Sequence, residues 1–210
     1  VQYEKESHNW RVQVSELIHR KAAYDARQAH VSSLFSGDGD REVTVLEERL
    51  KVRLAAVSWP RETNVSFDVT ENGRQVLLEV DLPEIEEMPR QTFVVARREL
   101  RLTSKSASER RVRELYMRHV HAVGLLILGE VFATLPMCDL VTISGYSQRP
   151  NKKTGATEDQ YLYSARVTRE EWMRIDFSAL KQVDPVTAFD AFTTRRDVSR
   201  IGLFRTIDPP

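Results

Sequence analysis

The sequence has one cysteine, Cys138, and no run of apolar residues long enough to cross a membrane. A single cysteine excludes an intrachain disulfide, which fits a reducing compartment. The longest apolar run, residues 122–135, contains Glu130 and falls short of the roughly 20 residues that a membrane-spanning helix needs. The sequence also lacks a secretory signal pattern. These absences predict a cytoplasmic protein with no membrane segment.

The sequence also lacks the motifs of well-known enzyme sites. It has no Gly-x-Gly-x-x-Gly, P-loop or Gly-x-Ser-x-Gly pattern and no Cys/His metal spacing. His119 and His121 are two residues apart on an expected helix, so they face different directions and cannot hold one metal ion together. His119 lies on the apolar stripe and is expected to be a core histidine with a backbone partner. We therefore expect no cofactor, no metal site and no catalytic residues.

The formal net charge is zero, but the charge is unevenly distributed along the chain. Residues 1–90 carry 12 Lys/Arg and 17 Asp/Glu, whereas residues 91–210 carry 19 and 14. One interpretation is that the two halves attract each other or are simply solvated. The alternative is a basic binding face in the second half.

The first 58 residues have the pattern of a helical hairpin. Apolar residues recur at helical spacing over 2–33 and again over 42–57, with a Gly-Asp-Gly loop at 36–40 between them. Trp59-Pro60 ends the second helix. The two helices are amphipathic and need a partner surface, either the rest of the chain or a second copy. The chain begins at Val1 rather than Met, so we expect a domain from a larger protein.

After residue 60 the spacing of apolar residues changes from the helical period to alternation, which is typical of strands. Strands are expected at 64–70 and 75–82, joined by a two-residue turn at Asn72-Gly73. An acidic connector follows over 83–89, and residues 92–102 read as a third strand. Val76, Leu78, Val80 and Leu82 are expected to share one face of the second strand.

A long helix is expected over 106–135, starting at a Ser106/Glu109 capping box. Gly124 and Gly129 lower its helix propensity, so we expect another backbone to approach there. Two strands, 140–145 and 160–167, flank a polar loop at 146–155. Helices begin at Thr168 and Asp184, and the tail from Val198 can add an edge strand.

These elements predict an α+β fold: a domain over 59–210 with a mixed or antiparallel sheet packed on one long central helix, preceded by the helical arm 1–58.

Basic residues gather in two places. Eight lie between Arg97 and Arg118, and a further group lies in the 146–155 loop, where Gly155 is expected in a left-handed turn. Clustered Lys and Arg are typical of phosphate binding; the alternative is a solvated helix start and a solvated hairpin tip. The candidate nucleic-acid-binding residues are Arg97, Arg98, Arg101, Arg110, Arg113, Arg149, Lys152 and Lys153.

The element order also resembles the core of the restriction-endonuclease fold, which places an acidic residue on one strand and Glu-x-Lys on the next to bind a metal. The corresponding residues would be Asp81 and Glu99-Leu100-Arg101, where arginine replaces the lysine and cannot give up a proton. Asp68, Glu79 and Asp81 could also cluster across the first hairpin. The alternative is that all of these are solvent-face residues.

Three segments carry a further resemblance: Leu115-Tyr-Met-Arg-His-Val-His-Ala-Val-Gly124, Ser144-Gly-Tyr-Ser-Gln-Arg-Pro-Asn-Lys-Lys-Thr-Gly155, and Tyr161-Leu-Tyr-Ser-Ala-Arg-Val167 followed by Trp172 and Ile175-Asp-Phe177. Together they resemble the C-terminal region of a group of bacterial proteins of unknown function. Some of those carry a small N-terminal domain of unknown function, and distant versions are fused to restriction-endonuclease-like domains. The resemblance covers about residues 65–210 and implies an accessory or interaction module.

Three functions remain open at this point. The first is a non-enzymatic binding or assembly module of a larger cytoplasmic bacterial protein, with a protein partner or self-association. The second is nucleic-acid binding through the basic residues. The third is a divergent metal-dependent nuclease using Asp81 and Glu99.

Overall fold

The computed structural model describes residues 39–59, 61, 63–96, 101–151 and 154–209. Those from Val45 onward belong to one compact unit that ends at Pro210. The expected helix over 2–33 lies outside the described residues, so the helical hairpin stays a prediction. Its second helix is α2, Gly39–Ala55, which matches the expected helix over 42–57 to within a few residues.

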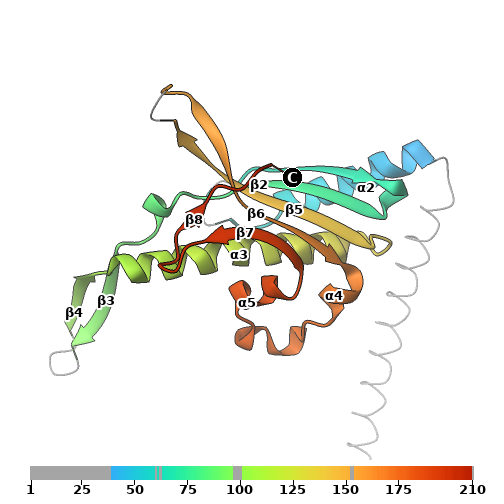
Figure 1. The fold of residues 1–210 in the computed structure, drawn as a ribbon. Helices are drawn as coiled ribbons and strands as arrows, with labels where there is room; N and C mark the ends of the chain where they lie inside the picture. The colour runs from blue at the N-terminus through green and yellow to red at the C-terminus, as the bar shows by residue number, and fades with distance from the viewer. Residues whose placement is uncertain (1–38, 60, 62, 97–100, 152–153, 210) are drawn as a thin grey trace, which may run out of the picture. The chain divides into compact units, whose positions relative to one another are not determined.

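A six-stranded mixed sheet forms the centre of the fold, in the order β1-β2-β5-β6-β7-β8 (Figure 1). The pair β2–β5 is parallel and every other pair in the sheet is antiparallel. The long helix α3, Glu109–Thr134, packs on one face. This confirms the expected α+β class. The strands are β1 Val65–Thr70, β2 Gln75–Asp81, β5 Leu140–Pro150, β6 Thr157–Thr168, β7 Thr193–Val198 and β8 Phe204–Arg205.

The core lies between this sheet and the helices on one side of it. Val76, Leu78 and Val80 on β2 are at most 2% exposed, as their alternation predicts. Val120, Ile127 and Val131 on α3 are completely buried and recur at helical spacing. On α2, the stripe of Leu46, Leu50 and Leu54 is buried as well. The α2 stripe therefore packs into the same unit as the sheet.

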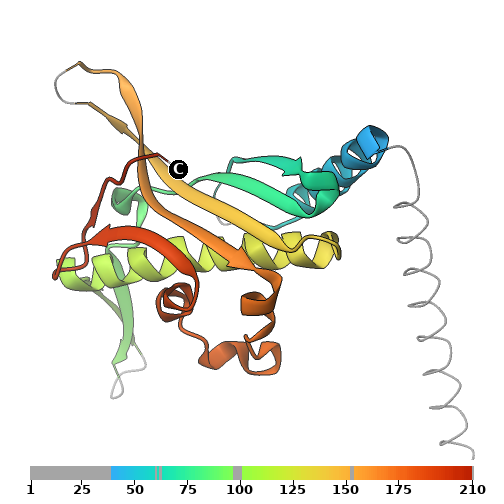
Figure 2. The same cartoon turned by 45° about the vertical axis from the view of Figure 1, so that its right-hand side comes forward.

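Three short helices complete the covered side of the sheet (Figure 2). They are α4 Arg169–Met173, η3 Phe177–Gln182 and α5 Pro185–Asp190. The capping box expected at Thr168 and the N-cap expected at Asp184 are both confirmed. Arg169 donates to the carbonyl oxygens of Leu135 (2.7 Å), which caps α3, and of Cys138 (2.8 Å) in the loop that follows, so it satisfies a carbonyl group that the end of α3 leaves without a helical partner.

Helix α3 is long and apolar enough to be a candidate membrane span by length and composition alone. Half of its apolar window is buried inside the fold. The core helix of a soluble protein passes the same test, so the observation is weak evidence for a membrane segment.

The prediction of a single strand over 92–102 is wrong. The chain forms two strands there, β3 Gln91–Ala96 and β4 Arg101–Ser106, which pair antiparallel in a sheet of their own. Figures 1 and 2 show this hairpin extending away from the sheet at the start of α3. The connection over 97–100 is Arg-Arg-Glu-Leu, which has none of the glycine, proline or asparagine residues that mark a turn in a sequence.

Two turns also differ from expectation. The connection between β1 and β2 has four residues, 71–74, rather than two, because Thr70 pairs with Gln75. Within it Glu71, Asn72 and Gly73 all have positive φ. The polar loop expected over 146–155 is shorter, because β5 continues to Pro150 through an irregularity at Gly145/Tyr146. Gly155 has φ of 73°, as expected.

The start of α3 and the strand β7 also differ from what the sequence predicts. The N-cap of α3 is Ser108, whose hydroxyl accepts from the amide of Arg111, so the capping box expected at Ser106 is wrong. Strand β7 was not expected, since Thr193–Val198 has almost no apolar residues. The expected tail strand is reduced to the two residues of β8 and a bridge between Tyr161 and Ile207.

Candidate functional site

The structure places the expected basic residues in different surroundings. Arg97, Arg98, Lys152 and Lys153 lie outside the described residues. The backbone of Arg101 belongs to β4, where it pairs with Ala96. Arg110, Arg113 and Arg149 lie at one end of α3, near the turn that joins β7 to β8. This turn brings in a further basic residue, Arg200, that the sequence did not single out.

A pocket of about 500 Å³ lies between the first turns of α3 and the β7–β8 turn. We call it the arginine pocket. Helix α3 contributes two arginines one turn apart, and the β7–β8 turn contributes the third from the other side. The lining residues are Arg110, Arg113, Glu114, Met117, Arg200, Ile201 and Gly202.

The charges that line the arginine pocket do not cancel. Arg110 donates through Nε to the carboxylate of Glu114 at 2.9 Å. That hydrogen bond is the main reason why the pKa of Glu114 lies below its ordinary value. Arg113 donates through Nε to the carbonyl oxygen of Glu109 at 3.0 Å, which is not a charge pair. Arg200 has no hydrogen bond or ion pair within the described part of the chain. Three cations therefore face one carboxylate.

The β7–β8 turn has a defined geometry. Ser199 accepts from Gly202 at 2.9 Å through its carbonyl oxygen and donates its own amide to the carbonyl oxygen of Leu203 at 2.8 Å. Its hydroxyl also accepts from the amide of Leu203 at 3.0 Å. Gly202 has φ of 78°, a conformation that glycine adopts without steric cost. These contacts fix the backbone of the turn that carries the exposed Arg200 and the 60% exposed Ile201.

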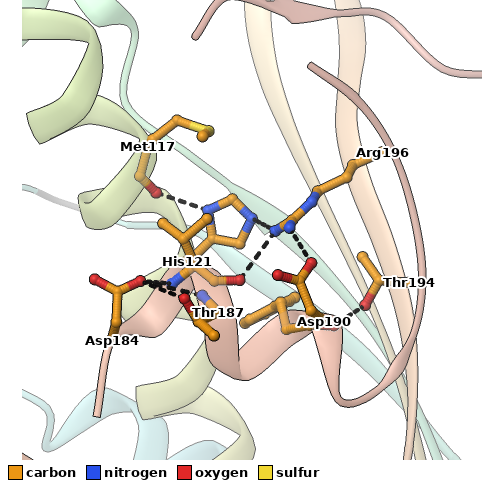
Figure 3. Close-up of polar contacts among 9 residues, drawn as sticks. Met117, His121, Asp184, Thr187, Asp190, Thr194 and Arg196 are labelled. Atoms are coloured by element: carbon orange, nitrogen blue, oxygen red, sulfur yellow. Dashed lines mark hydrogen bonds and ion pairs between the residues drawn. The ribbon is translucent and has the colours of Figure 1, made fainter. Parts of the chain in front are cut away.

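A polar network around the buried ring of His121 ties β7 to α3 and α5, as Figure 3 shows. The ring of His121 is completely buried. Its Nδ1 lies 2.6 Å from the carbonyl oxygen of Met117, and its Nε2 lies 2.7 Å from Nη1 of Arg196 on β7. Arg196 also binds the carboxylate of Asp190 and the carbonyl oxygen of Val186. Because Nε2 must accept from arginine, the imidazole is neutral with its proton on Nδ1.

The environment of His121 disfavours its charged form. The pKa of His121 is lowered to about 4. Burial is the largest cause, and the charge of the neighbouring Arg196 contributes in the same direction. Both ring nitrogens are occupied, so this histidine has no free nitrogen for proton transfer. Its role is to position β7 against α3.

Aromatic contacts hold the other side of the β7–β8 turn. Phe204, the first residue after the turn, stacks on His121 with ring centroids 5.8 Å apart. It also meets the ring of Tyr116 edge-on at 5.9 Å. The turn is therefore held on the β7 side by Arg196 and on the β8 side by Phe204. This arrangement sets the position of Arg200 relative to Arg110 and Arg113.

Arg149 lies on the other side of the same turn. It lines a smaller pocket of about 80 Å³ that shares Gly202 with the arginine pocket. Its guanidinium lies 3.6 Å from the carboxylate of Glu86. Beneath it, Tyr116 donates to the carbonyl oxygen of Pro83 at 3.0 Å, and burial raises the pKa of this tyrosine to about 12. Arg149 is thus near the arginine pocket, but it is partly neutralised.

The β3–β4 hairpin starts from the same end of α3. At its base the amide of Ala107 donates to the carbonyl oxygen of Arg90, and an ion pair between Arg90 and Glu109 joins this base to the helix. The described side chains of this hairpin, at 91–93 and 103–106, are exposed, and Phe93 is 68% exposed. An isolated two-stranded hairpin is marginally stable in water, so a partner surface would stabilise it.

The core position expected for His119 is wrong. His121, not His119, is the fully buried histidine with a backbone partner. His119 is half-buried, and burial lowers its pKa from the ordinary value. Cys138 is buried, and its burial raises the pKa of the thiol to about 11. A thiol of this kind is protonated at neutral pH and behaves as a small apolar group.

The residues of the nuclease hypothesis are only partly described. Glu99 lies outside the described residues. Burial is the largest cause that raises the pKa of Asp81, and Arg61 lies 3.8 Å from its carboxylate. Glu79 accepts a hydrogen bond from Tyr161 at 2.6 Å. Across the described ranges, no group of three or more His, Cys, Asp or Glu side chains is placed to hold a metal ion.

A shallow groove of about 510 Å³ runs over the uncovered face of the sheet, between β1, β2 and β5. It is lined by Asp68, Leu77 and Glu79 with smaller polar residues, and the hydroxyl of Ser144 donates to that of Ser164 at 3.1 Å nearby. Asp68 and Glu79 therefore share a face, as the register of β1 and β2 also requires.

No protein-family model, no curated protein and no solved structure matches this chain. The resemblance noted for residues 65–210 therefore stays a prediction.

Proposed function

We propose that this chain is a non-enzymatic binding module that contacts the phosphates of nucleic acid through the arginine pocket. The observation that carries the proposal is that three arginines, two from α3 and one from the β7–β8 turn, line one pocket beside a single carboxylate. Arginine forks match phosphate oxygens in geometry and in charge. The unpaired state of Arg200 within the described residues leaves all of its donors to a ligand.

The β3–β4 hairpin supports a nucleic-acid partner at the same end of the molecule. Two-stranded β-ribbons enter the grooves of DNA in several binding proteins. Exposed aromatic side chains such as Phe93 are suited to stacking on bases of single strands. Lys105, on the second strand, is also exposed. A nucleic-acid strand bound at the arginine pocket would therefore pass close to the base of the exposed β3–β4 hairpin.

The test is the affinity of the full chain for labelled single- and double-stranded DNA and RNA, measured by fluorescence anisotropy at several salt concentrations. The informative variant is Arg200→Glu, because Arg200 is exposed and contacts no described side chain through a hydrogen bond or ion pair. The matched control is Arg166→Glu, which makes the same charge change at an exposed position of β6. Arg166 pairs with Thr142, next to the buried Val141 and Ile143, so it lies on the sheet face away from α3.

We expect Arg200→Glu to weaken binding on the order of tenfold, the loss of one charge-assisted contact. Arg166→Glu should have a much smaller effect. If neither DNA nor RNA binds at low salt, or if the two variants weaken binding equally, the arginine pocket is not the nucleic-acid site.

A second candidate function is self-association through the β3–β4 hairpin. Its specific support is the exposure of the described hairpin side chains, with Phe93 as the largest apolar one. Two copies could pair their hairpins and cover these residues. Sedimentation velocity tests this: Phe93→Ser should shift a dimer toward monomer, whereas Met173→Ser, at a similarly exposed residue of α4, should not. A native chain that is monomeric at all concentrations would rule this function out.

A further inference from the structure

We infer that the arginine pocket takes a phosphate monoester attached to a group of nucleotide size, rather than the diester backbone of a continuous strand. This inference rests on the proposed function, because it concerns the same residues. It names which phosphate the site selects. The shared chemistry is a terminal phosphate beside a small organic group, whether this belongs to a free mononucleotide or to the phosphorylated end of a nucleic acid.

The size of the arginine pocket fits one small ligand. Its three arginines line a single cavity of about 500 Å³. This volume falls in the range of small-molecule sites, which is roughly 300–1,000 Å³. A continuous strand would instead be contacted along a track of cations, one for each of several successive phosphates. Among the described arginines at this end of α3, Arg149 is separated from the pocket by the β7–β8 turn and is paired with Glu86.

The net charge of the arginine pocket also favours a phosphate monoester. The pocket carries Arg110, Arg113 and Arg200 against Glu114, which is a formal charge of +2. A phosphate monoester carries about −1.5 to −2 at neutral pH, whereas each diester linkage carries only one negative charge. The monoester therefore matches the charge of the pocket, and the diester leaves part of it uncompensated.

Two arginines of the pocket have guanidinium nitrogens to which no described residue is bound. Arg113 uses Nε to bind the carbonyl oxygen of Glu109, so its guanidinium is held in place while no described residue accepts from its two terminal nitrogens. No described residue binds the guanidinium group of Arg200. The two groups come from opposite walls of the pocket, so they can bind different oxygens of one phosphate. A terminal phosphate offers three such oxygens.

The lining of the arginine pocket also has an apolar part. Met117 and the 60% exposed Ile201 lie beside the arginines. A flexible methionine adapts to ligands of irregular shape, and an exposed isoleucine gains from being covered. These two side chains offer a surface for the sugar or base that carries the phosphate. Inorganic phosphate alone would leave this surface uncovered.

The experiment compares a 5′-phosphorylated oligonucleotide with the same oligonucleotide ending in a 5′-hydroxyl, and a mononucleotide 5′-phosphate with its nucleoside and with inorganic phosphate. Affinities are measured for the full chain, for Arg200→Gln and for the control Arg166→Gln, with circular dichroism to confirm that each variant is folded. We expect each phosphorylated ligand to bind about tenfold or more tightly than its unphosphorylated counterpart. Arg200→Gln should remove this preference, and Arg166→Gln should keep it.

The outcomes separate the inference from the proposed function. If both oligonucleotides bind equally and Arg200→Gln weakens both, the proposed function holds and the preference for a terminal phosphate is wrong. If the mononucleotide binds and neither oligonucleotide does, the pocket is a small-molecule site and the nucleic-acid function is wrong. If inorganic phosphate binds as tightly as the mononucleotide, the apolar wall has no role and the inference fails. If none of the ligands binds, both proposals fail.

Discussion

Acidification from pH 7 to pH 4 should lower the free energy of unfolding by about 3 kcal/mol through His121 alone. Its pKa is about 4 in the folded protein, against 6.5 for an ordinary histidine. One pKa unit corresponds to about 1.4 kcal/mol, so the difference amounts to about 3 kcal/mol. Because the unfolded chain takes up the proton first, this stability is fully present above pH 6.5 and is lost as the pH falls toward 4.

The groups around His121 explain why the charged form is disfavoured. Arg196 on β7 lies 2.7 Å from Nε2, and Tyr163 on β6 and Phe189 on α5 enclose the ring. Asp190 and Asp184 on α5 partly oppose the shift, because their negative charges favour a protonated imidazole. A second proton on His121 would remove the acceptor for Arg196 and place two cations in contact. The loss of stability should therefore be accompanied by loosening of β7.

The assay is urea denaturation followed by circular dichroism between pH 7 and pH 4. Other groups also titrate in this range, so the contribution of His121 is read from His121→Gln, which lacks the titrating ring. This variant should be less stable than the native chain at pH 7 and should lose about 3 kcal/mol less on acidification. His119→Gln, two residues away and half-buried, should keep most of the native loss. An unchanged pH profile in His121→Gln would refute the reasoning.

Two further predictions concern packing and use matched pairs of variants, measured by thermal or chemical denaturation. Gly124→Ala should destabilise the fold by about 1–3 kcal/mol, because the new Cβ would lie 2.6 Å from the hydroxyl of Tyr163. Gly129→Ala, whose Cβ would lie an ordinary 3.4 Å from the nearest ring atom, should be neutral or stabilising by up to about 1 kcal/mol; equal effects at the two glycines would contradict this packing. Leu50→Ala should cost about 2–5 kcal/mol, because the side chain is completely buried. Val52→Ala, at a 67% exposed residue of the same helix, should stay within about 0.5 kcal/mol, and a comparable loss in both variants would contradict the burial of α2.

The parts of the fold that the sequence predicts are those set by local chemistry. The alternation from Val76 to Leu82 fixes which face of β2 is buried: Val76, Leu78, Val80 and Leu82 are buried, whereas Leu77 on the other face is 42% exposed. The caps at Thr168 and Asp184 depend on residues within three positions, so they are visible in the sequence. The class of the fold follows from such elements and their order.

The features that the sequence does not reveal depend on contacts between distant residues. Strand β7 has no apolar face of its own; its pairing with β6 and the contacts of Arg196 hold it in place. Gly124 was expected to admit a second backbone, but aromatic side chains approach it instead, Tyr163 from β6 and Phe189 from α5. His121 is buried because β7, β8 and α5 cover the side of α3 on which it lies, beyond the stripe that faces the sheet.

The candidate site was predictable in the same partial way. Its two helical arginines, Arg110 and Arg113, stand out in the sequence as part of a basic run. Arg200 does not, because it enters the site only when β7 and β8 place their turn against α3. The signal that could have found this turn is Ser199-Arg-Ile-Gly202, a polar residue and a glycine that favour a turn just before the apolar Leu203-Phe204.

The most direct test of the arginine pocket is the salt dependence of nucleic-acid binding by the native chain, Arg200→Glu and Arg166→Glu. A cation that binds a phosphate releases a counterion, so its removal lowers the slope of log affinity against log salt by roughly one unit. We predict a lower slope and a weaker affinity for Arg200→Glu, with the slope of Arg166→Glu equal to that of the native chain. Equal slopes for all three proteins, or no binding by the native chain at low salt, would contradict the assignment of the arginine pocket as a phosphate-binding site.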